Sequence, residues 1–530
     1  MRTQPSLIIL PQVIFLLAVP GLTSRVAAEG IVDLKPGRET TWFTAPVRED
    51  GRVDYPSAIN AYWKPDRYVA HNNAVGGIAK VFGPDFLAKT VRSRTLEELG
   101  VDSLPAKRPR GDYFRPSTNK SEVFDQQLAK AVTTIWTPQN LPLVSRWMTH
   151  NTFPLLEMQK AVGHRDEFYR PVYLPEGKHL LRDAPIPEVD LYVHCSHALA
   201  AKTTAFFQWR DNKKALRYLR AAFKLARLAG NSPTPRERRA AWKCERIASR
   251  ALFPAIEAGM LEGKEAKELR QWLDDIPARG SVAGAFDTYT RCVLLDIVAA
   301  SAMDDGKTFD QAILAATDPN ADAPLPIAEK KEWAVKEMNG AAFDINRILA
   351  VCNRWLDAEA KALKADTPHL ARRTQLALRK QLTKAAAVQK KFIESPQFTL
   401  SLRQSRFNHA ARRAVADAVA ICLLQALWTW EPGLADSHAE AQAHTEVVRT
   451  ALAIAAYKGI IKRMPTKPTD VVTGFLPKWP KDPYTGGDLK VRAVEGGYCV
   501  YSVGPNRKDE KGNHEPDRKD GADDISITVK

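Results

Sequence analysis

The sequence contains few cysteines, and those are far apart. None belongs to a C-x-x-C pair or has a histidine at zinc-finger spacing, which excludes a disulfide scaffold and a zinc ribbon. Most lie in apolar, helix-like segments such as RCVLLDIV and AICLLQAL, where a cysteine is typically a small buried apolar residue. The six are Cys195, Cys244, Cys292, Cys352, Cys422 and Cys499.

Long apolar runs are also missing after residue 28, so no later segment is predicted to span a membrane. The only apolar run near the N-terminus, LIILPQVIFLLAV, is short and is followed by a small-residue VAA sequence. We therefore predict a signal peptide over 1–28, removed after Ala28, and an exported mature chain in the periplasm, the envelope or outside the cell. The alternative is an uncleaved anchor, which the shortness of the run and its interruption by Pro11 and Pro20 disfavour.

Catalytic signatures are absent as well. The sequence has no G-x-S-x-G, H-E-x-x-H, Walker loop or dinucleotide fingerprint. The stretch 117–120, STNK, fits S-x-x-K, but neither S-D-N nor K-T-G follows it, so chance explains the match. A binding protein is favoured over an enzyme, although the question stays open.

Two groups of residues carry the enzymatic alternative. His194 and His197 would share a helix face and are able to bind zinc, but a third ligand is needed; packed or surface histidines are the favoured interpretation. A second group has side chains suited to acid–base chemistry, and surface residues of a helix and its following turn explain it equally well. Its members are His150, Asn151, Glu157, His164, Asp166 and Glu167.

Positive charge is plentiful: the formal net charge is +16, and the mature chain remains basic. Such a surface favours anionic partners such as envelope polymers, acidic polysaccharide or nucleic acid. Because the cations are spread along many helices without interleaved aromatic residues, we expect a solvated basic surface and no specific nucleic-acid binding.

One basic segment, ARRTQLALRKQLTKAAAVQKKF, is predicted to form an amphipathic helix. Leu376, Leu382 and Val388 make an apolar stripe that we expect to face the interior, with the lysines and arginines in water. The alternative is a helix that lies on an anionic polymer or membrane.

The residues from 137 to 463 have a sustained helical period. In KKALRYLRAAFKLARLAG, Leu216, Leu219 and Phe223 share one face, and Gly230 ends the helix. The next helix opens on TPRE at 234–237, a capping box with proline at the first helical position. The same reasoning predicts helices around 187–209, 236–259, 264–275, 282–304, 343–363, 367–394, 404–430 and 435–462.

The predicted fold is mainly α: an irregular array of helical hairpins, either a bundle or a tetratricopeptide-like stack, since no fixed 34-residue period is present. A mixed N-terminal region, 29–136, is expected to pack on this helical domain. In the C-terminal region, 464–530, GDLKVRAV, YCVYSV and ISITV read as strands of a small antiparallel sheet. In the last, Ile525, Ile527 and Val529 alternate with polar residues.

The C-terminal region resembles that of the major pseudopilin of type II secretion systems. The resemblance rests on a helix ending AIAAYKGIIKRMP, then KDPY at 481–484 with Gly486, YSVG at 501–504, and DDI at 523–525. In that family the loop between the last strands wraps a calcium ion, to which the final aspartate pair supplies ligands. The resemblance implies calcium held by Asp523, Asp524, Asn506 and Asp520, with loop carbonyls.

This loop departs from the family in its charge. Asn506 and Arg507 stand where the family has Asp-Gly, and the six acidic residues from Gly504 through Asp523 are accompanied by five basic ones. Near-cancellation weakens the field that draws a divalent cation. The alternative to a calcium site is therefore a solvated loop held only at its ends.

Segments along the whole chain, TWFTAPVREDGRVDY, HNNA, FGPD and CNRWLDAEAK among them, resemble a family of exported planctomycete proteins with this same terminal module. This resemblance implies architecture and export without an activity. Our leading prediction is an exported envelope or periplasmic binding or scaffold protein. The alternatives are an enzyme acting on an envelope polymer and an accessory component of a type II secretion or pilus-like system.

Overall fold

Helices make up most of the protein, and one small sheet lies near the C-terminus, so the predicted fold class is confirmed. The computed structural model describes residues 34–105, 114, 122–163, 165–302, 344–365, 367–393, 395–405, 407–427, 433–472, 474–513 and 522–530. The predicted signal peptide, 1–28, lies outside the described residues. Within them, no helix has the length and apolar character needed to cross a membrane.

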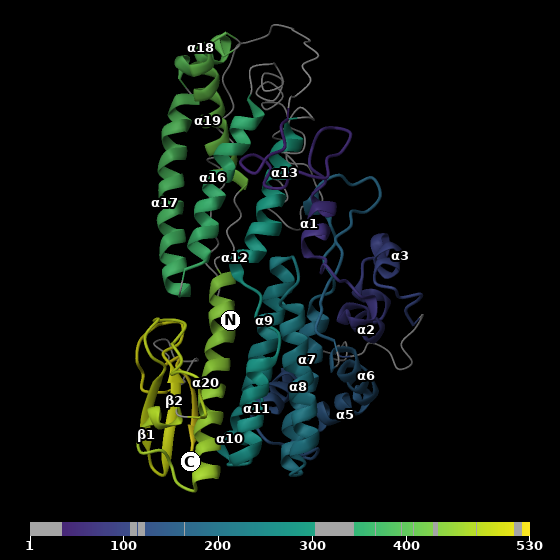
Figure 1. The fold of residues 1–530 in the computed structure, drawn as a ribbon, viewed down its shortest axis with the longest axis vertical. Coiled ribbons are helices and arrows are strands. Elements are labelled where there is room, and N and C mark those ends of the chain that lie inside the picture. The colour runs from purple at the N-terminus through teal and green to yellow at the C-terminus, as the bar shows by residue number, and fades with distance from the viewer. Residues whose placement is uncertain are drawn as a thin grey trace.

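Short helices form the N-terminal part of the described chain, on the side of the molecule away from the sheet (Figure 1). They are α1 Tyr55–Trp63, α2 Ala74–Phe82, α3 Lys89–Glu98, α4 Glu122–Thr133, α5 Pro142–His150 and α6 Thr152–Gly163.

Longer helices then follow close to the predicted ranges. The lower half of Figure 1 contains α7 Asp190–Gln208, α8 Asn212–Ala229, α9 Pro235–Arg250, α10 Phe253–Glu257, α11 Gly263–Asp275 and α20 Gly433–Ile461. The upper half contains α13 Arg291–Ser301, reached through α12 Val282–Ala285 and a π-helical turn Phe286–Thr290, and then α16 Ile345–Leu363, α17 Pro368–Ile393, α18 Pro396–Gln404 and α19 His409–Leu427.

The helix boundaries follow local chemistry. Thr234 caps α9 through its Oγ1, which accepts a hydrogen bond from the amide of Glu237 at 3.3 Å, as the capping box predicts. The carboxylate of Glu237 does not reach back to the cap amide, because Arg170 holds it in a buried two-pronged ion pair, with donor distances of 2.7 and 2.6 Å. The cap therefore ties α9 to the segment before α7.

Two hydrophobic clusters divide the interior. The larger joins α2–α11 to α20 and the sheet. The second joins the segment 34–59 to α13 and to α16–α19. The N-terminal region contributes to both, since α1 packs in the second cluster and α2 in the first.

The sheet is a three-stranded antiparallel meander in the order β1-β2-β3. Its strands are β1 Lys490–Val494, β2 Gly497–Ser502 and β3 Ile525–Val529. Ile525, Ile527 and Val529 are buried and alternate with half-buried residues, as predicted. Because this face packs on α20 and α10, the position of α20 decides the position of the sheet.

The C-terminal end of α20 passes unusually close to the start of α11. A Cβ at Gly459 would lie 2.2 Å from the main-chain nitrogen of Gly263. Only glycine allows two backbones to approach this closely. Glycine at 459 is thus a packing requirement of the α20–α11 crossing.

Replacing Gly459 by alanine should lower the free energy of unfolding by about 1–3 kcal/mol, because the added methyl group has no room. Chemical denaturation of the purified protein measures the change. Gly433→Ala, in the same helix and with no atom of the described residues within 4 Å of its Cβ position, is the matched control and should change stability by less than about 1 kcal/mol. Equal effects of the two changes would contradict the steric explanation.

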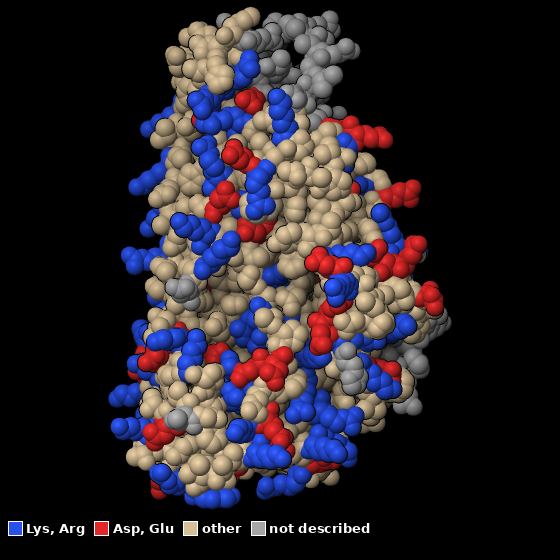
Figure 2. All heavy atoms as spheres, in the orientation of Figure 1, with Lys and Arg blue, Asp and Glu red and all other residues tan. Residues whose placement is uncertain are grey.

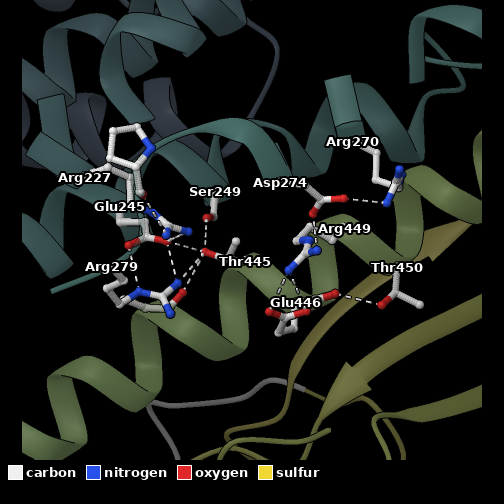
Figure 3. A network of polar contacts seen from close by, with 12 residues as sticks. Arg227, Glu245, Ser249, Arg270, Asp274, Arg279, Thr445, Glu446, Arg449 and Thr450 are labelled. Atoms are coloured by element: carbon white, nitrogen blue, oxygen red, sulfur yellow. Dashed lines mark hydrogen bonds and ion pairs between the residues drawn. The ribbon is translucent and has the colours of Figure 1, made fainter. Parts of the chain in front are cut away.

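A buried ion network holds α20 against its neighbours (Figure 3). Glu245 of α9, almost fully buried, accepts hydrogen bonds from Arg279 at 2.6 and 2.9 Å and forms an ion pair with Arg227 of α8 at 2.8 Å. Thr445 of α20 donates its hydroxyl to the same carboxylate at 2.8 Å. One carboxylate thus joins α8, α9, α20 and the segment after α11.

A second group of ion pairs lies one helical turn farther along α20. Asp274 of α11 accepts from Arg270 at 2.7 Å and also pairs with Arg449 of α20. Arg449 in turn binds Glu446 at 3.1 Å. Together the two groups fix both the rotation and the axial position of α20 relative to α9 and α11.

Glu245→Gln should destabilise the protein by about 3–5 kcal/mol at neutral pH, because two buried guanidinium groups lose their counter-charge. The control is Glu440→Gln, which removes a partly exposed partner of Arg246 and should cost less than about 1 kcal/mol. Denaturant unfolding compares the two variants. If Glu245→Gln cost no more than the control, the network would not be what holds α20.

The same carboxylate predicts a pH dependence. Burial by itself would raise the pKa of Glu245, but Arg279 and Arg227 outweigh it and lower the pKa from its usual 4.5 to about 2. A carboxylate with a depressed pKa stabilises the fold above its unfolded pKa, and this contribution disappears as the pH falls toward the folded pKa. The wild-type protein should therefore lose about 3 kcal/mol between pH 5 and pH 2 that Glu245→Gln does not lose. A pH-independent stability difference between the two proteins would refute this.

Candidate metal centre

The turn that precedes the sheet is built around a buried aspartate. Asp482, 1% exposed, accepts hydrogen bonds from the amide of Tyr484 through Oδ1 at 2.8 Å and from the amide of Val503 through Oδ2 at 2.9 Å. The first bond folds the KDPY turn on itself, and the second attaches the turn to the residue just after β2. Asp482 thereby fixes the point at which the loop between β2 and β3 begins.

Three carboxylates meet inside that loop. Glu510, Asp523 and Asp524 each offer an oxygen atom, and these atoms all lie within 4.8 Å of one another. Asp524 is 0% exposed, and its Oδ2 accepts from the amide of Gly512 at 2.7 Å. Oδ1 of Asp524 and Oε2 of Glu510 are buried and accept no hydrogen bond from the described residues. Such buried acceptors need a donor or a cation.

The loop backbone makes room for this arrangement. Gly504 has a φ of +66°, and a Cβ there would lie 2.2 Å from the carbonyl oxygen of Asp523. The amide of Asn506 then donates to Oδ2 of Asp523 at 3.0 Å. Glycine at 504 thus permits the close approach of the two ends of the loop, which brings Asp523 beneath it.

The electrostatics of the cluster favour a bound cation. Burial, together with charge repulsion from the neighbouring Glu510, raises the pKa of Asp524 from 3.8 to about 7, despite the opposing hydrogen bond from the amide of Gly512. Carboxylates held this close repel one another when ionised, and a divalent cation removes the repulsion. All three side chains of the cluster would bind a metal through carboxylate oxygen atoms. The cluster therefore suits a hard cation such as calcium, which takes six to eight oxygen ligands, rather than zinc.

The residues predicted as calcium ligands from the sequence fall into three situations. Asp523 and Asp524 lie in the cluster. Asn506 lies beside it, but its Oδ1 accepts from the amide of Lys508 at 2.6 Å while its Nδ2 donates to Glu510 at 2.7 Å. Its side chain therefore contacts Glu510 directly, and its role as a calcium ligand stays a prediction. Asp520 lies outside the described residues.

Glu510 was not among the predicted ligands. In the sequence it stands beside Asp509, and nothing in the local pattern separates the two. In the structure, Asp509 accepts from the hydroxyl of Tyr501 at 3.0 Å and from the amide of Lys511 at 3.0 Å, so that it faces β2. The turn of the loop directs Glu510 to the cluster and Asp509 away from it.

The acid–base residues singled out in the sequence are not gathered in one place. Asn151 is buried and serves the backbone, accepting from Phe114 and donating to Trp147. Glu157 and Asp166 line a groove of about 700 Å³ between α6, α8 and α11, where each forms an ion pair with a lysine. His150 is not part of this lining, and His164 lies outside the described residues.

The second histidine of the His194–His197 pair on α7 is packed against the helix backbone. Nδ1 of His197 lies 3.0 Å from the carbonyl oxygen of Val193, and burial lowers the pKa of His197 to about 4. Among the residues that the structure describes, only the Glu510 cluster brings three histidine, cysteine or carboxylate ligand atoms this close together. The six cysteines are all free thiols, and most are buried.

Comparison with known proteins adds no relative. No family model, curated protein or solved structure matches the chain. The resemblances to pseudopilins and to exported planctomycete proteins therefore stay predictions.

Asp482→Asn should loosen the start of the loop, because the amide accepts fewer and weaker hydrogen bonds than the carboxylate. We expect a cost of about 1–3 kcal/mol and faster hydrogen exchange at the amides of Tyr484 and Val503. Asp488→Asn, which removes an exposed partner of Lys481 in the same turn, is the control and should leave both amides unchanged. Unaltered exchange in Asp482→Asn would show that Asp482 does not anchor the loop.

Proposed function

We propose that the protein is an exported binding scaffold whose C-terminal module is completed by calcium. The observation that carries the proposal is the convergence of Glu510, Asp523 and Asp524, with a buried oxygen of Asp524 that accepts no hydrogen bond from the described residues. Extracellular and periplasmic surroundings supply calcium at concentrations that suit the weaker class of calcium modules. Export itself rests on the signal peptide expected over 1–28.

Calcium would act at a structural junction. The loop 504–513 reaches α17, where Nη1 of Arg507 lies 2.5 Å from Nδ1 of His369. The preceding turn reaches the same place, since a Cβ at Gly486 would lie 2.7 Å from Cγ2 of Thr367. A cation that fixes the loop therefore also fixes the contact between the sheet module and the upper helices.

The extended helical surface supports the scaffold part of the proposal. Helices α7, α8 and α9 pack on one another, as do α16, α17 and α19, so that the protein is an extended array of helices. Arrays of this kind typically act as binding surfaces. An accessory role in a secretion or pilus-like system is the second candidate. The order of the elements supports it, because the long helix α20 is followed by β1, β2, the carboxylate loop and β3, the order on which the resemblance to the major pseudopilin rests.

Calcium titration of the full-length protein tests the proposal. Isothermal titration calorimetry should give one site, and 5 mM calcium should raise the free energy of unfolding by about 1–2 kcal/mol for a dissociation constant of 10⁻³ to 10⁻⁴ M. Asp523→Asn combined with Asp524→Asn should abolish both effects. This double variant should not destabilise the calcium-free protein, because it removes the repulsion among the carboxylates of the cluster.

The matched control is Glu495→Gln, which removes an exposed carboxylate from the turn between β1 and β2 and should leave calcium binding intact. A wild-type protein with neither binding heat nor stabilisation at millimolar calcium would sink the calcium proposal. Recovery of secretion-system subunits in a pull-down from the native cell would favour the second candidate, and their repeated absence would count against it.

A further inference from the structure

Helix α17 has an extreme charge composition. Its 26 residues include seven lysines and arginines and no aspartate or glutamate. Five of the cations are exposed, and four of these, Arg373, Lys380, Lys384 and Lys391, follow one another at spacings of seven, four and seven residues. At 3.6 residues per turn these spacings place all four on one face, along about 27 Å of the helix.

The apolar stripe predicted for this helix is only partly buried. Leu382 is 3% exposed and belongs to the second hydrophobic cluster, as predicted. Leu376 and Val388, in contrast, are 41% and 64% exposed, so the prediction that they face the interior is wrong. They are exposed because α17 is a peripheral helix that buries only a narrow strip of its surface. Leu376 lies on one side of the line of cations and Val388 on the other.

The positive charge continues past the end of the helix. Arg507 of the C-terminal module contacts His369 at the start of α17, and Arg372 and Arg373 lie close enough to help lower the pKa of His369, after burial and Arg507. Arg372 also pairs with Asp436 at 3.4 Å. Figure 2 shows blue side chains along the left edge of the molecule, where Figure 1 places α17 above the sheet.

We propose that this α17 face, Arg373, Leu376, Lys380, Lys384, Val388 and Lys391, binds a linear acidic polysaccharide. The inference names a ligand class for the binding scaffold proposed above and in that respect rests on it. A row of like charges on one helix face repels itself, and a polymer with regularly repeated carboxylates relieves the repulsion at several points at once. The two apolar side chains beside the cations suit the apolar faces of sugar rings.

The arrangement fits a polymer better than a lipid bilayer. A helix that lies in a membrane interface buries an apolar centre, with its cations at the borders. On α17 the order is reversed, since the cations form the central line and Leu376 and Val388 flank it. Single-stranded nucleic acid is disfavoured because the face has no aromatic residue on which bases would stack.

Binding of the full-length protein to polygalacturonate tests the inference, with neutral pullulan as the reference polymer. Wild-type protein should bind polygalacturonate and not pullulan, with an affinity that falls steeply as salt rises. In Lys380→Gln with Lys384→Gln, affinity at 50 mM salt should fall at least about tenfold, and the slope of log affinity against log salt should fall by about two.

The matched control removes two exposed lysines from other helices: Lys213→Gln in α8 with Lys264→Gln in α11. It should leave both affinity and salt slope close to wild type, whereas an equal loss would show that net charge alone acts and would overturn the inference. No binding of polygalacturonate would overturn it too. So would tighter, Lys380- and Lys384-dependent binding to phosphatidylglycerol vesicles or to DNA.

The two proposals fail separately. If polygalacturonate does not bind but calcium still stabilises the protein, the α17 inference is wrong and the calcium module stands. If polygalacturonate binds with the expected variant dependence in a protein that calcium does not stabilise, the α17 inference stands and the calcium proposal falls.

Discussion

Glu245 sits in a space that water does not reach, between the guanidinium groups of Arg227 and Arg279 and the hydroxyl of Thr445. A buried carboxylate is tolerable only when its charge is compensated, so the four side chains fix one another and the helices that carry them. Helix α20 is the one on which the rest depends. The sheet packs on it, the carboxylate loop closes over the sheet, and the loop in turn meets α17.

In the loop between β2 and β3, acidic and basic side chains lie on different sides. Counted along the sequence, its acidic and basic residues nearly cancel, and a calcium site there looks poorly supported. In three dimensions Glu510, Asp523 and Asp524 converge at the base of the loop, while Arg507 points outward to His369. The loop and its return to β3 thus contribute a negative site inside the module and extend a positive surface outside it.

Much of the fold follows from local pattern. The helices, the capping box at Thr234 and the alternation of Ile525, Ile527 and Val529 were all predictable, because hydrophobic period and capping act within a few residues of one another. The exposure of Leu376 and Val388 was not, because the width of the strip that a helix buries depends on how many neighbours cover it. Asp523 and Asp524 were found through a resemblance, whereas Glu510 was found only in the structure.

The sequence by itself determined the elements and their order: a long series of helices, a final helix and a three-stranded meander. Only the tertiary structure decided which carboxylates meet, which arginines surround Glu245 and which face of α17 stays in water. The physical reason is the distance along the chain between the residues that interact. Propensity, capping and alternation are settled between residues close in the chain, whereas burial, ion pairing and charge convergence depend on groups such as Glu245 and Thr445, or Arg507 and His369, that the fold brings together from distant positions.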